Sequence, residues 1–570
     1  MNKQKLYYHW IIGVALVLLL NSAFSFLHIG VDLTEDKRYT LTASSLDYVK
    51  NISTPLELTV YLEGEMPMGF KRLASAAENI ATAYNRISNG NFSIKFEKPG
   101  EGLSDSLKAV LYDSLQKIGI HPTNVKAQGD DQDQLQETLI FPGAVLSSPT
   151  GQIGIDFIEG QNSMDGLTAL NNAASQMEYK ITKAIKVLTR DTFPLIGYLT
   201  GNDEPLDYSV YDLIENVVKK EYRFSILPID SISFIPADFQ IILINQPHQS
   251  FKEQQKLMID QYIMHGGKVI WALDYLFASM DSLQKSNGSF VAFDMGLNLD
   301  DQLFKYGVRI NRDLVQDLES DQVPSIVGNM GGKPQIQLLP WPYAPLVRDR
   351  GYHPISRNLD KVLTSFPQSI DTVSVKGVST AVLLSSSEYG RKLPTPALVE
   401  WKSIKSEGDL KDFTTAHIPT AVLLEGNFSS AYKNRISGEQ ASVWMKNTGS
   451  QFLEAANTST EMIVISDGDI FLNPVSDSDG PLAMGSNRYT RIQYANKEFL
   501  KNCLFYLSDG KELLASRAKN FQLRLLNKEI LKEDKSIWRW INLLGPLLLP
   551  LLISFLVKFY RKRKYSSPLL

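Results

Sequence analysis

The chain has little cysteine and no nucleotide-binding loop. Its 570 residues include one cysteine, Cys503, which excludes an internal disulfide, a Cys-x-x-Cys redox pair and a zinc site built from several cysteines. The pattern Gly-x-x-x-x-Gly-Lys-Ser/Thr is also missing, because the Gly-Gly-Lys triplets at 266–268 and 331–333 continue with Val269 and Pro334. ATP hydrolysis by a P-loop mechanism is therefore excluded. No Gly-x-Ser-x-Gly nucleophile elbow is present either.

Acidic residues outnumber basic residues in the middle of the chain. The net charge is −4, and eight cations without acidic neighbours lie at the two ends, which leaves −12 for residues 6–537. An acidic middle argues against nucleic acid or anionic lipid as a ligand. The hydrophobic fraction of 44% suffices for packed cores, and the length suits two to four domains.

Each end carries an apolar run of membrane-spanning length, at 10–28 and 538–560, and the second stops at the basic residues 561–564. The alternatives are a cleaved signal peptide for the first run and a buried core helix for the second. The missing small-x-small cleavage site and the flanking tryptophans favour two transmembrane helices. The basic tail predicts a two-pass protein of the inner (cytoplasmic) membrane, with cytoplasmic termini and its bulk in the periplasm.

Between the two runs, the pattern predicts an α/β chain with two domains. Residues 29–190 follow the order strand-helix-strand-helix-strand-strand-helix, which is typical of a thioredoxin-like domain, here without catalytic cysteines. Thr42 is the expected N-cap of a short first helix at 43–50. The fold alone assigns no activity. The predicted elements are strands at 56–62 and 92–96, helices at 70–86, from 107 and at 169–188, and a hairpin of 139–146 with 153–158.

The second predicted domain spans 191–510. Continuous apolar strands alternate with helices at 209–220 and 252–264, which predicts a Rossmann-like parallel sheet covered on both faces. A stretch rich in glycine and proline, about 275–375, is interpreted as an insertion. The remaining segments are a cytoplasmic N-terminus at 1–9, a juxtamembrane segment at 511–537 and a basic cytoplasmic tail at 561–570.

Acidic residues follow three of the predicted strands. The carboxyl edge of an open α/β sheet faces its ligand, so these residues are candidate contacts for a cationic or hydroxyl-rich ligand. A divalent cation between Asp467 and Asp469 is an alternative, but a turn in which Asp accepts backbone N–H bonds is favoured there. For Asp203 and Glu204, a loop that caps the next helix is favoured. No catalytic residue, metal or cofactor is predicted. The candidates are Asp203, Glu204, Asp274, Asp467 and Asp469.

Other residue types that often carry function are isolated here. His353 and His417 have no partner pattern and are expected to be structural. Trp341 and Tyr343, set between prolines, could form an aromatic platform for a sugar or a partner loop. Packing of the insertion on the core is the favoured interpretation.

Several short phrases occur together in a characteristic order, at 257–271, 303–308, 313–317, 353–355, 424–430, 434–435, 466–469, 517–519 and 524–526. In that order and spacing the chain resembles the gliding-motility ABC-transporter auxiliary proteins of the GldG type from Bacteroidetes bacteria. The family often has Gly-His-Gly-Glu where this chain has Gly201-Asn202-Asp203-Glu204, so no role of that histidine carries over.

The resemblance implies a non-catalytic, substrate-binding-like subunit in the membrane. Its implied partners are an ABC permease subunit, a separate ABC ATPase subunit and other gliding or secretion components, with no nucleic acid. Its central domain would be of the GIFT type, related to a domain of intraflagellar transport proteins. Two other functions stay open: a structural tether between the inner membrane and the motility or secretion machinery, and a periplasmic metal-dependent hydrolase that uses Asp467, Asp469 and Asp274.

Overall fold

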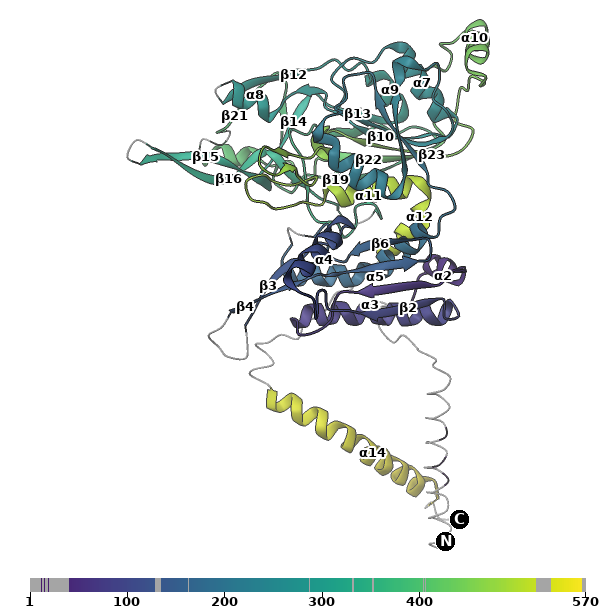
Figure 1. Ribbon diagram of the computed structural model, residues 1–570, viewed down its shortest axis with the longest axis vertical. Coiled ribbons are helices and arrows are strands. Elements are labelled where there is room, and N and C mark those ends of the chain that lie inside the picture. The colour runs from purple at the N-terminus through teal and green to yellow at the C-terminus, as the bar shows by residue number, and fades with distance from the viewer. Residues whose placement is uncertain are drawn as a thin grey trace. The chain divides into compact units, whose positions relative to one another are not determined.

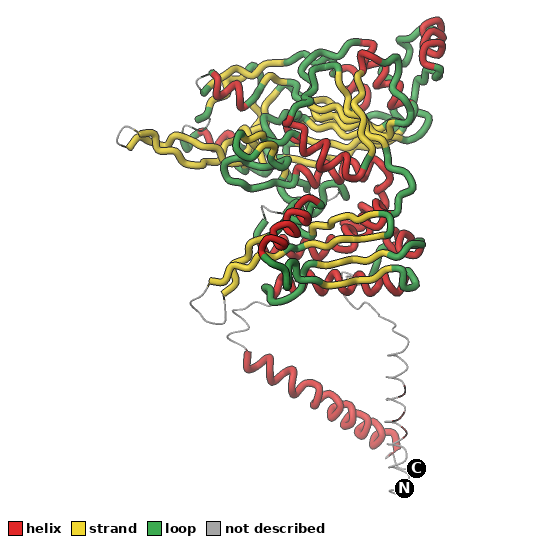
Figure 2. The backbone as a smooth tube through the Cα atoms, in the orientation of Figure 1, coloured by secondary structure: helices red, strands yellow, loops and turns green. Residues whose placement is uncertain are grey.

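The computed structural model shows a mixed α/β protein (Figures 1 and 2). It divides into two units, Met1–Phe521 and Gln522–Leu570, which are treated separately. The residues that the structure describes are 12, 15, 19, 40–128, 135–161, 164–286, 288–330, 333–350, 353–402, 404, 406–518 and 535–565.

A four-stranded sheet comes first in the chain. Its order is β2-β1-β5-β6, with β1 parallel to β2 and antiparallel to β5, and β5 antiparallel to β6. The hairpin of β3 (Thr123–Gln128) and β4 (Leu135–Ile140) precedes β5 and forms its own two-stranded sheet. The strands of the main sheet are β1 (Leu56–Val60), β2 (Phe92–Phe96), β5 (Gly143–Ser148) and β6 (Gly151–Asp156).

Helices pack on both faces of this sheet. Apolar residues of α3 (Met68–Ile87) and α5 (Gly166–Leu188) share one core with the strands. Leu115 of α4 (Asp105–Lys117) belongs to a second, smaller cluster with Phe141. The short α2 (Ala43–Lys50) is capped by Thr42, as predicted, and Glu178 of α5 accepts hydrogen bonds from the Thr42 amide (2.7 Å) and hydroxyl (2.8 Å).

A seven-stranded sheet forms the centre of the rest of the unit, in the order β19-β22-β23-β10-β9-β7-β8. Five strands are parallel, but β22 and β19 run antiparallel to their neighbours, so the sheet is mixed and not purely parallel as predicted. The strands are β7 (Leu195–Thr200), β8 (Arg223–Pro228), β9 (Phe239–Asn245), β10 (Lys268–Ala272), β19 (Val378–Ser385), β22 (Pro419–Gly426) and β23 (Thr460–Ile465).

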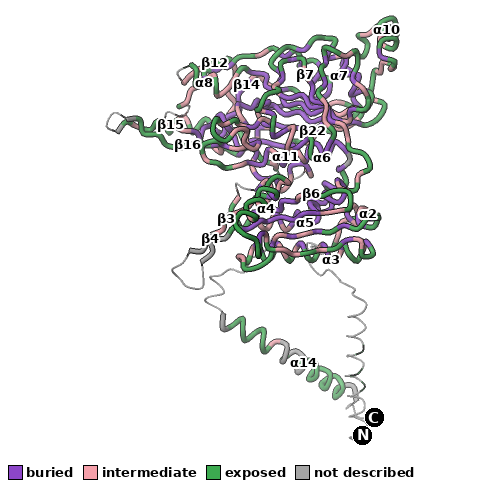
Figure 3. The backbone as a smooth tube through the Cα atoms, viewed as in Figure 1, coloured by how far each residue is buried: buried purple, intermediate pink, exposed green. Residues whose placement is uncertain are grey.

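Both faces of this sheet are covered, so its central strands are buried (Figure 3). One face packs on α11 (Asn496–Phe505) and the segment after β7, and the other on α7 (Glu253–Met264) and α9 (Asp300–Tyr306). The predicted helix at 209–220 is not a regular α-helix. It is the 3-10 turn η1 (Tyr208–Val210), the π-helix η2 (Asp212–Val218) and the last turn α6 (Lys219–Glu221).

The segments between β10 and β22 form small sheets beside the large one. Trp341 and Tyr343 are each 2% exposed and pack with Phe366, so the packing interpretation is confirmed and the aromatic platform is wrong. The elements are β11 (Leu276–Phe277), α8 (Met280–Lys285), β12 (Ser289–Asp294), β13 (Val308–Ile310), β14 (Asp313–Asp317), β15 (Ser320–Met330), β16 (Lys333–Val347), β17 (Val362–Leu363), β18 (Ile370–Thr372), β20 (Gly390–Pro394), β21 (Ala397–Glu400) and η4 (Asp409–Asp412).

Short elements complete the first unit. They are η3 (Ile229–Ser231), α10 (Gly438–Thr448), η5 (Asp469–Phe471), β24 (Val475–Ser476), β25 (Gly480–Pro481), η6 (Tyr506–Gly510), α12 (Lys511–Leu514) and η7 (Ala515–Ala518).

The prediction of two membrane-spanning helices is wrong. In the part of the chain that the structure describes, no helix has the length and apolar character needed to cross a bilayer. The predicted span 538–560 falls in α14 (Lys535–Tyr565). The predicted span 10–28 lies outside the described residues except for 12, 15 and 19. The two-pass inner-membrane placement rested on these spans and is overturned with them.

Candidate functional site

Three neighbouring parallel strands, β9, β10 and β23, bring polar residues to one edge of the seven-stranded sheet. Asp274 follows β10, Asp467 and Asp469 follow β23, and Gln246 follows β9. Carboxyl ends of parallel strands meet at the same edge, and this edge is the usual ligand side of open α/β sheets. We call these four residues the edge cluster.

Gln246 joins the carboxylates of the edge cluster. Its Nε2 donates to Asp274 Oδ2 at 3.0 Å and to Asp469 Oδ1 at 2.7 Å. The Gly468 amide donates to Asp274 Oδ1 at 2.9 Å. One neutral amide group and one backbone amide therefore hold carboxylates from two strands together.

Asp467 is used by the backbone around it. Its Oδ1 accepts from the Asp469 amide at 2.8 Å, and its Oδ2 accepts from the Ser365 amide, also at 2.8 Å. This is the Asp turn that the sequence favoured at this position. Because both oxygens of this fully buried carboxylate already accept a hydrogen bond, Asp467 mainly fixes the turn that presents Asp469.

Burial makes the three aspartates of the edge cluster hold their protons more tightly than free aspartates do. It raises the pKa of Asp274 to about 6. It raises the pKa of Asp469 to about 7, with a further contribution from the charge of Asp274. Burial, followed by the charges of Asp274 and Asp469, also raises the pKa of Asp467. These groups interact, so the ionisation of one carboxyl raises the pKa of its neighbours.

Asp203 and Glu204 lie on the loop that follows β7. The Asn202 amide donates to Glu204 Oε2 at 2.8 Å, and burial raises the pKa of Glu204. Glu204 is 7% exposed, and its Oε1 has no hydrogen-bond partner among the described residues. Asp203 adopts a left-handed backbone conformation with φ 64°. Its carbonyl lies 3.0 Å from His248 Nδ1.

The structure therefore brings three of the five candidate residues into one network and places the other two on the neighbouring loop. The connection runs through His248, whose ring contacts the Asp203 carbonyl and whose charge offsets a small part of the burial-driven rise in the pKa of Asp469. Loops that follow β7 and β9 meet here because β7 and β9 are adjacent although β8 separates them in sequence. Such a reversal of strand order opens a crevice in doubly wound sheets.

The sequence interpretation missed Gln246 and His248. Both follow β9 directly, so the strand-end rule that selected the acids could also have selected them. The metal-hydrolase alternative gains no support from the geometry. Within the described ranges, no group of three or more His, Cys, Asp or Glu side chains is placed to hold a metal ion.

The isolated histidines have structural surroundings. Burial lowers the pKa of His353 to about 4, and its ring packs edge-on against Tyr506. The amide of Ile355 donates to His353 Nδ1 at 3.3 Å. His417 adopts φ 60° and its amide donates to the Ser387 carbonyl at 2.8 Å. Both observations agree with the structural role expected from the sequence.

Comparisons with known proteins point to transport. A family model described as an ABC-type uncharacterized transport system matches residues 194–503, which is more than half of the chain. A model of a domain of unknown function matches residues 35–147. A comparison with curated proteins finds no match. Among solved structures, the mmIFT52 N-terminal domain is 11% identical, with 55% of this chain and 98% of that chain covered and a TM-score of 0.30, too low to compare the folds.

Proposed function

Because the chain belongs to the family of ABC-type uncharacterized transport system proteins, we propose that it is the auxiliary, substrate-binding-like subunit of an ABC transporter required for bacterial gliding motility. The family supports an auxiliary role in an ABC transport system. Gliding motility and a Bacteroidetes source are the finer part of the proposal, and their support is the resemblance of the phrases at 257–271 and 424–430 to GldG-type proteins.

The observation that carries the proposal is the position of the family match. It begins one residue before β7 and ends within α11, so it contains all seven strands of the large sheet and its acidic edge. The sequence contributes no P-loop. A protein of this kind needs a separate ATPase to drive transport and a separate permease to provide the pathway. We propose both as its partners and propose that the chain itself is non-catalytic.

We also propose the sheet edge as the ligand-facing side of the subunit. Asp203, Glu204, Asp274, Asp467 and Asp469 are the candidate contacts. The unpartnered Glu204 Oε1 and the Gln246 amide that bridges two carboxylates favour a cationic or hydroxyl-rich ligand, which can replace that amide as a donor.

The test is the identity of the proteins that accompany the chain. The full-length chain is tagged, purified from its own cells in mild detergent, and its companions are identified by mass spectrometry, with the same tag on an unrelated protein as the control. We expect a permease and a P-loop ATPase at a fixed ratio. Recovery of neither would contradict the proposal, and recovery of motility components in their place would favour the tether.

A further inference from the structure

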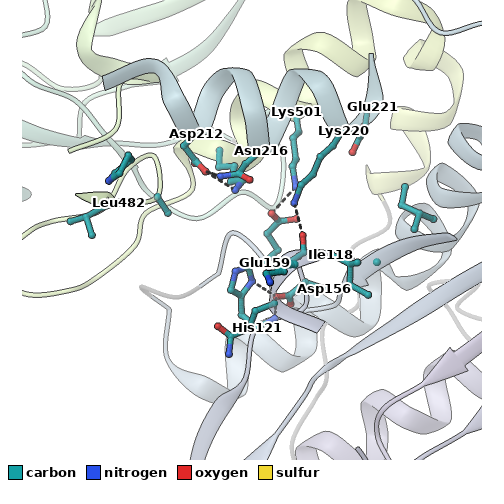
Figure 4. Close-up of a pocket in the computed structure, with 18 residues that line it drawn as sticks. Ile118, His121, Asp156, Glu159, Asp212, Asn216, Lys220, Glu221, Leu482 and Lys501 are labelled. Carbon is teal, nitrogen blue, oxygen red and sulfur yellow. Dashed lines mark hydrogen bonds and ion pairs between the residues drawn. The ribbon is translucent and has the colours of Figure 1, made fainter. Parts of the chain in front are cut away.

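A cavity of about 330 Å³ lies away from the sheet edge, where the first sheet meets the rest of the first unit (Figure 4). The end of α4 and strand β6 form one side of it. The π-helix η2, the turn α6 and helix α11 form the other. Its volume is at the lower end of the range of small-molecule sites.

Two helical segments direct polar side chains at four-residue spacing toward this cavity. Asp212, Asn216 and Lys220 line it from η2 and α6, and Lys497 and Lys501 from α11. Asp212 Oδ1 accepts from Asn216 Nδ2 at 2.7 Å and lies 3.1 Å from Lys497 Nζ. A π-helix is uncommon in proteins and occurs frequently at functional sites.

The carboxylates that line the cavity are already paired. Glu159 Oε1 lies 2.7 Å from Lys501 Nζ. Burial alone would raise the pKa of Glu159, but the charges of Lys501, Lys497 and Lys180 outweigh it and hold the pKa below its usual value. Glu159 is therefore ionised and neutralised by its own lysine. The other pairs are Asp212 with Lys497, Glu221 with Lys183, and Asp156 with the His121 amide and ring.

Lys220 is the exception among the charged groups at this cavity. Its Nζ donates to the Lys117 carbonyl at 3.2 Å, and no carboxylate among the described residues lies within ion-pair distance of it. Burial lowers the pKa of Lys220 and the charges of Lys497 and Lys501 lower it further, while those of Glu159 and Asp212 offset part of this fall. The Lys220 side chain is exposed, so its ammonium group is a cation without a carboxylate partner that an anion in the cavity can reach.

We propose that this cavity binds a small organic oxyanion, whose carboxylate or phosphate group pairs with the Lys220 ammonium. Lys497 and Lys501 keep their ion pairs with Asp212 and Glu159, so Lys220 supplies the uncompensated positive charge. Asn216 and His121, which line the same cavity, offer hydrogen bonds to hydroxyl groups of the ligand. An anion bound here contacts residues of the first sheet and of α11 together, so it also stabilises their packing.

The test is binding of defined probes to the full-length protein at low salt. Inorganic phosphate, citrate and glucuronate are compared with uncharged glucose by titration calorimetry and by thermal unfolding. We expect at least one of the three anions to bind and to raise the melting temperature, and glucose to do neither. Failure of all three anions to bind would overturn the inference.

A matched pair of lysines separates specific binding from general charge. Lys220→Gln should weaken binding about tenfold or more, because a charge-assisted hydrogen bond is lost, and Lys220→Arg should retain it. Lys219→Gln is the control, since Lys219 is the adjacent residue and its Nζ pairs with Glu215 at 2.5 Å. Equal weakening in both glutamine variants would overturn the site. The measurement needs no partner protein, so its failure leaves the proposed transporter role standing.

Discussion

Single residues at the sheet edge decide the charge state of the candidate site. Asp274 and Asp469 each have one oxygen bonded to Gln246 Nε2, and burial gives both a raised pKa. A buried carboxylate with a raised pKa is most stable when protonated. The edge cluster therefore favours the folded state at acidic pH and loses that contribution as the pH rises through about 7.

The first prediction concerns Asp469→Asn. In the wild type, the contribution of Asp469 is fully present below the pKa of the unfolded chain, near 4, and is lost as the pH rises to the folded-state pKa of about 7. The amide cannot ionise, so at pH 8 the variant should be more stable than the wild type by roughly 4 kcal/mol, since each pKa unit corresponds to about 1.4 kcal/mol. At pH 5 the difference should be less than half as large, because Asp469 is then protonated in the folded state and only its ionisation in the unfolded chain opposes folding.

Urea unfolding at the two pH values measures this difference. Asp477→Asn, at an exposed position outside the edge cluster, is the control and should show the same difference at both pH values. A destabilisation by Asp469→Asn that is equal at pH 5 and pH 8 would show that Asp469 acts only through its hydrogen bond to Gln246.

At the scale of the element, a tight backbone approach brings two strands of the large sheet together. Gly426 ends β22 with φ 146°, and a Cβ atom added there would overlap the Gly377 carbonyl next to β19. This approach allows β19 to pair with β22 along its length. Gly426 lies in the segment 424–430, one of the phrases by which the chain resembles GldG-type proteins. The close backbone approach explains why this position requires a glycine.

The second prediction follows from this contact. Gly426→Ala should destabilise the protein by roughly 2–4 kcal/mol, because the backbone must shift or remain strained at a positive φ. Gly438→Ala is the matched control, since nothing lies within 4 Å of an added Cβ in the first turn of α10. Thermal unfolding compares the two variants. Similar melting temperatures would mean that the β19–β22 contact adapts without cost.

Elements also show where the sequence was informative. The strands β7, β9, β10 and β23 are continuous apolar runs, and the N-cap at Thr42 is a local signal, so both were predictable. The π-helix η2 was not, because apolar spacing over a few turns does not separate it from an α-helix. The antiparallel direction of β22 was not predictable either, since it depends on which strand lies beside it.

The candidate site was also predictable from the sequence only in part. Strand-end position predicted that Asp274, Asp467 and Asp469 would share an edge, because parallel strands align their carboxyl ends. The network itself depends on Gln246, whose role is visible only once β9 lies next to β10. The cavity at Lys220 was not predicted at all, since its residues come from segments more than 300 positions apart.

At the scale of the whole molecule, the first unit contains a large α/β region that matches a transport family and a first sheet with its own core. Charged pairs connect them, including Lys501 with Glu159 and Lys183 with Glu221. The predicted domain limits of 29–190 and 191–510 remain a proposal. The predicted membrane-spanning helices failed because apolar composition alone suggested a length and character that no described helix has.

The most direct test of the proposed transporter role is the gliding of cells in which the proposed partner ATPase is inactive. The P-loop lysine of that ATPase is replaced, and gliding speed and the amount of the chain are measured. The account predicts that gliding stops while the chain remains at its normal level, because an auxiliary subunit acts only through ATP-driven transport. Normal gliding with the inactive ATPase would contradict the account and would favour a structural tether.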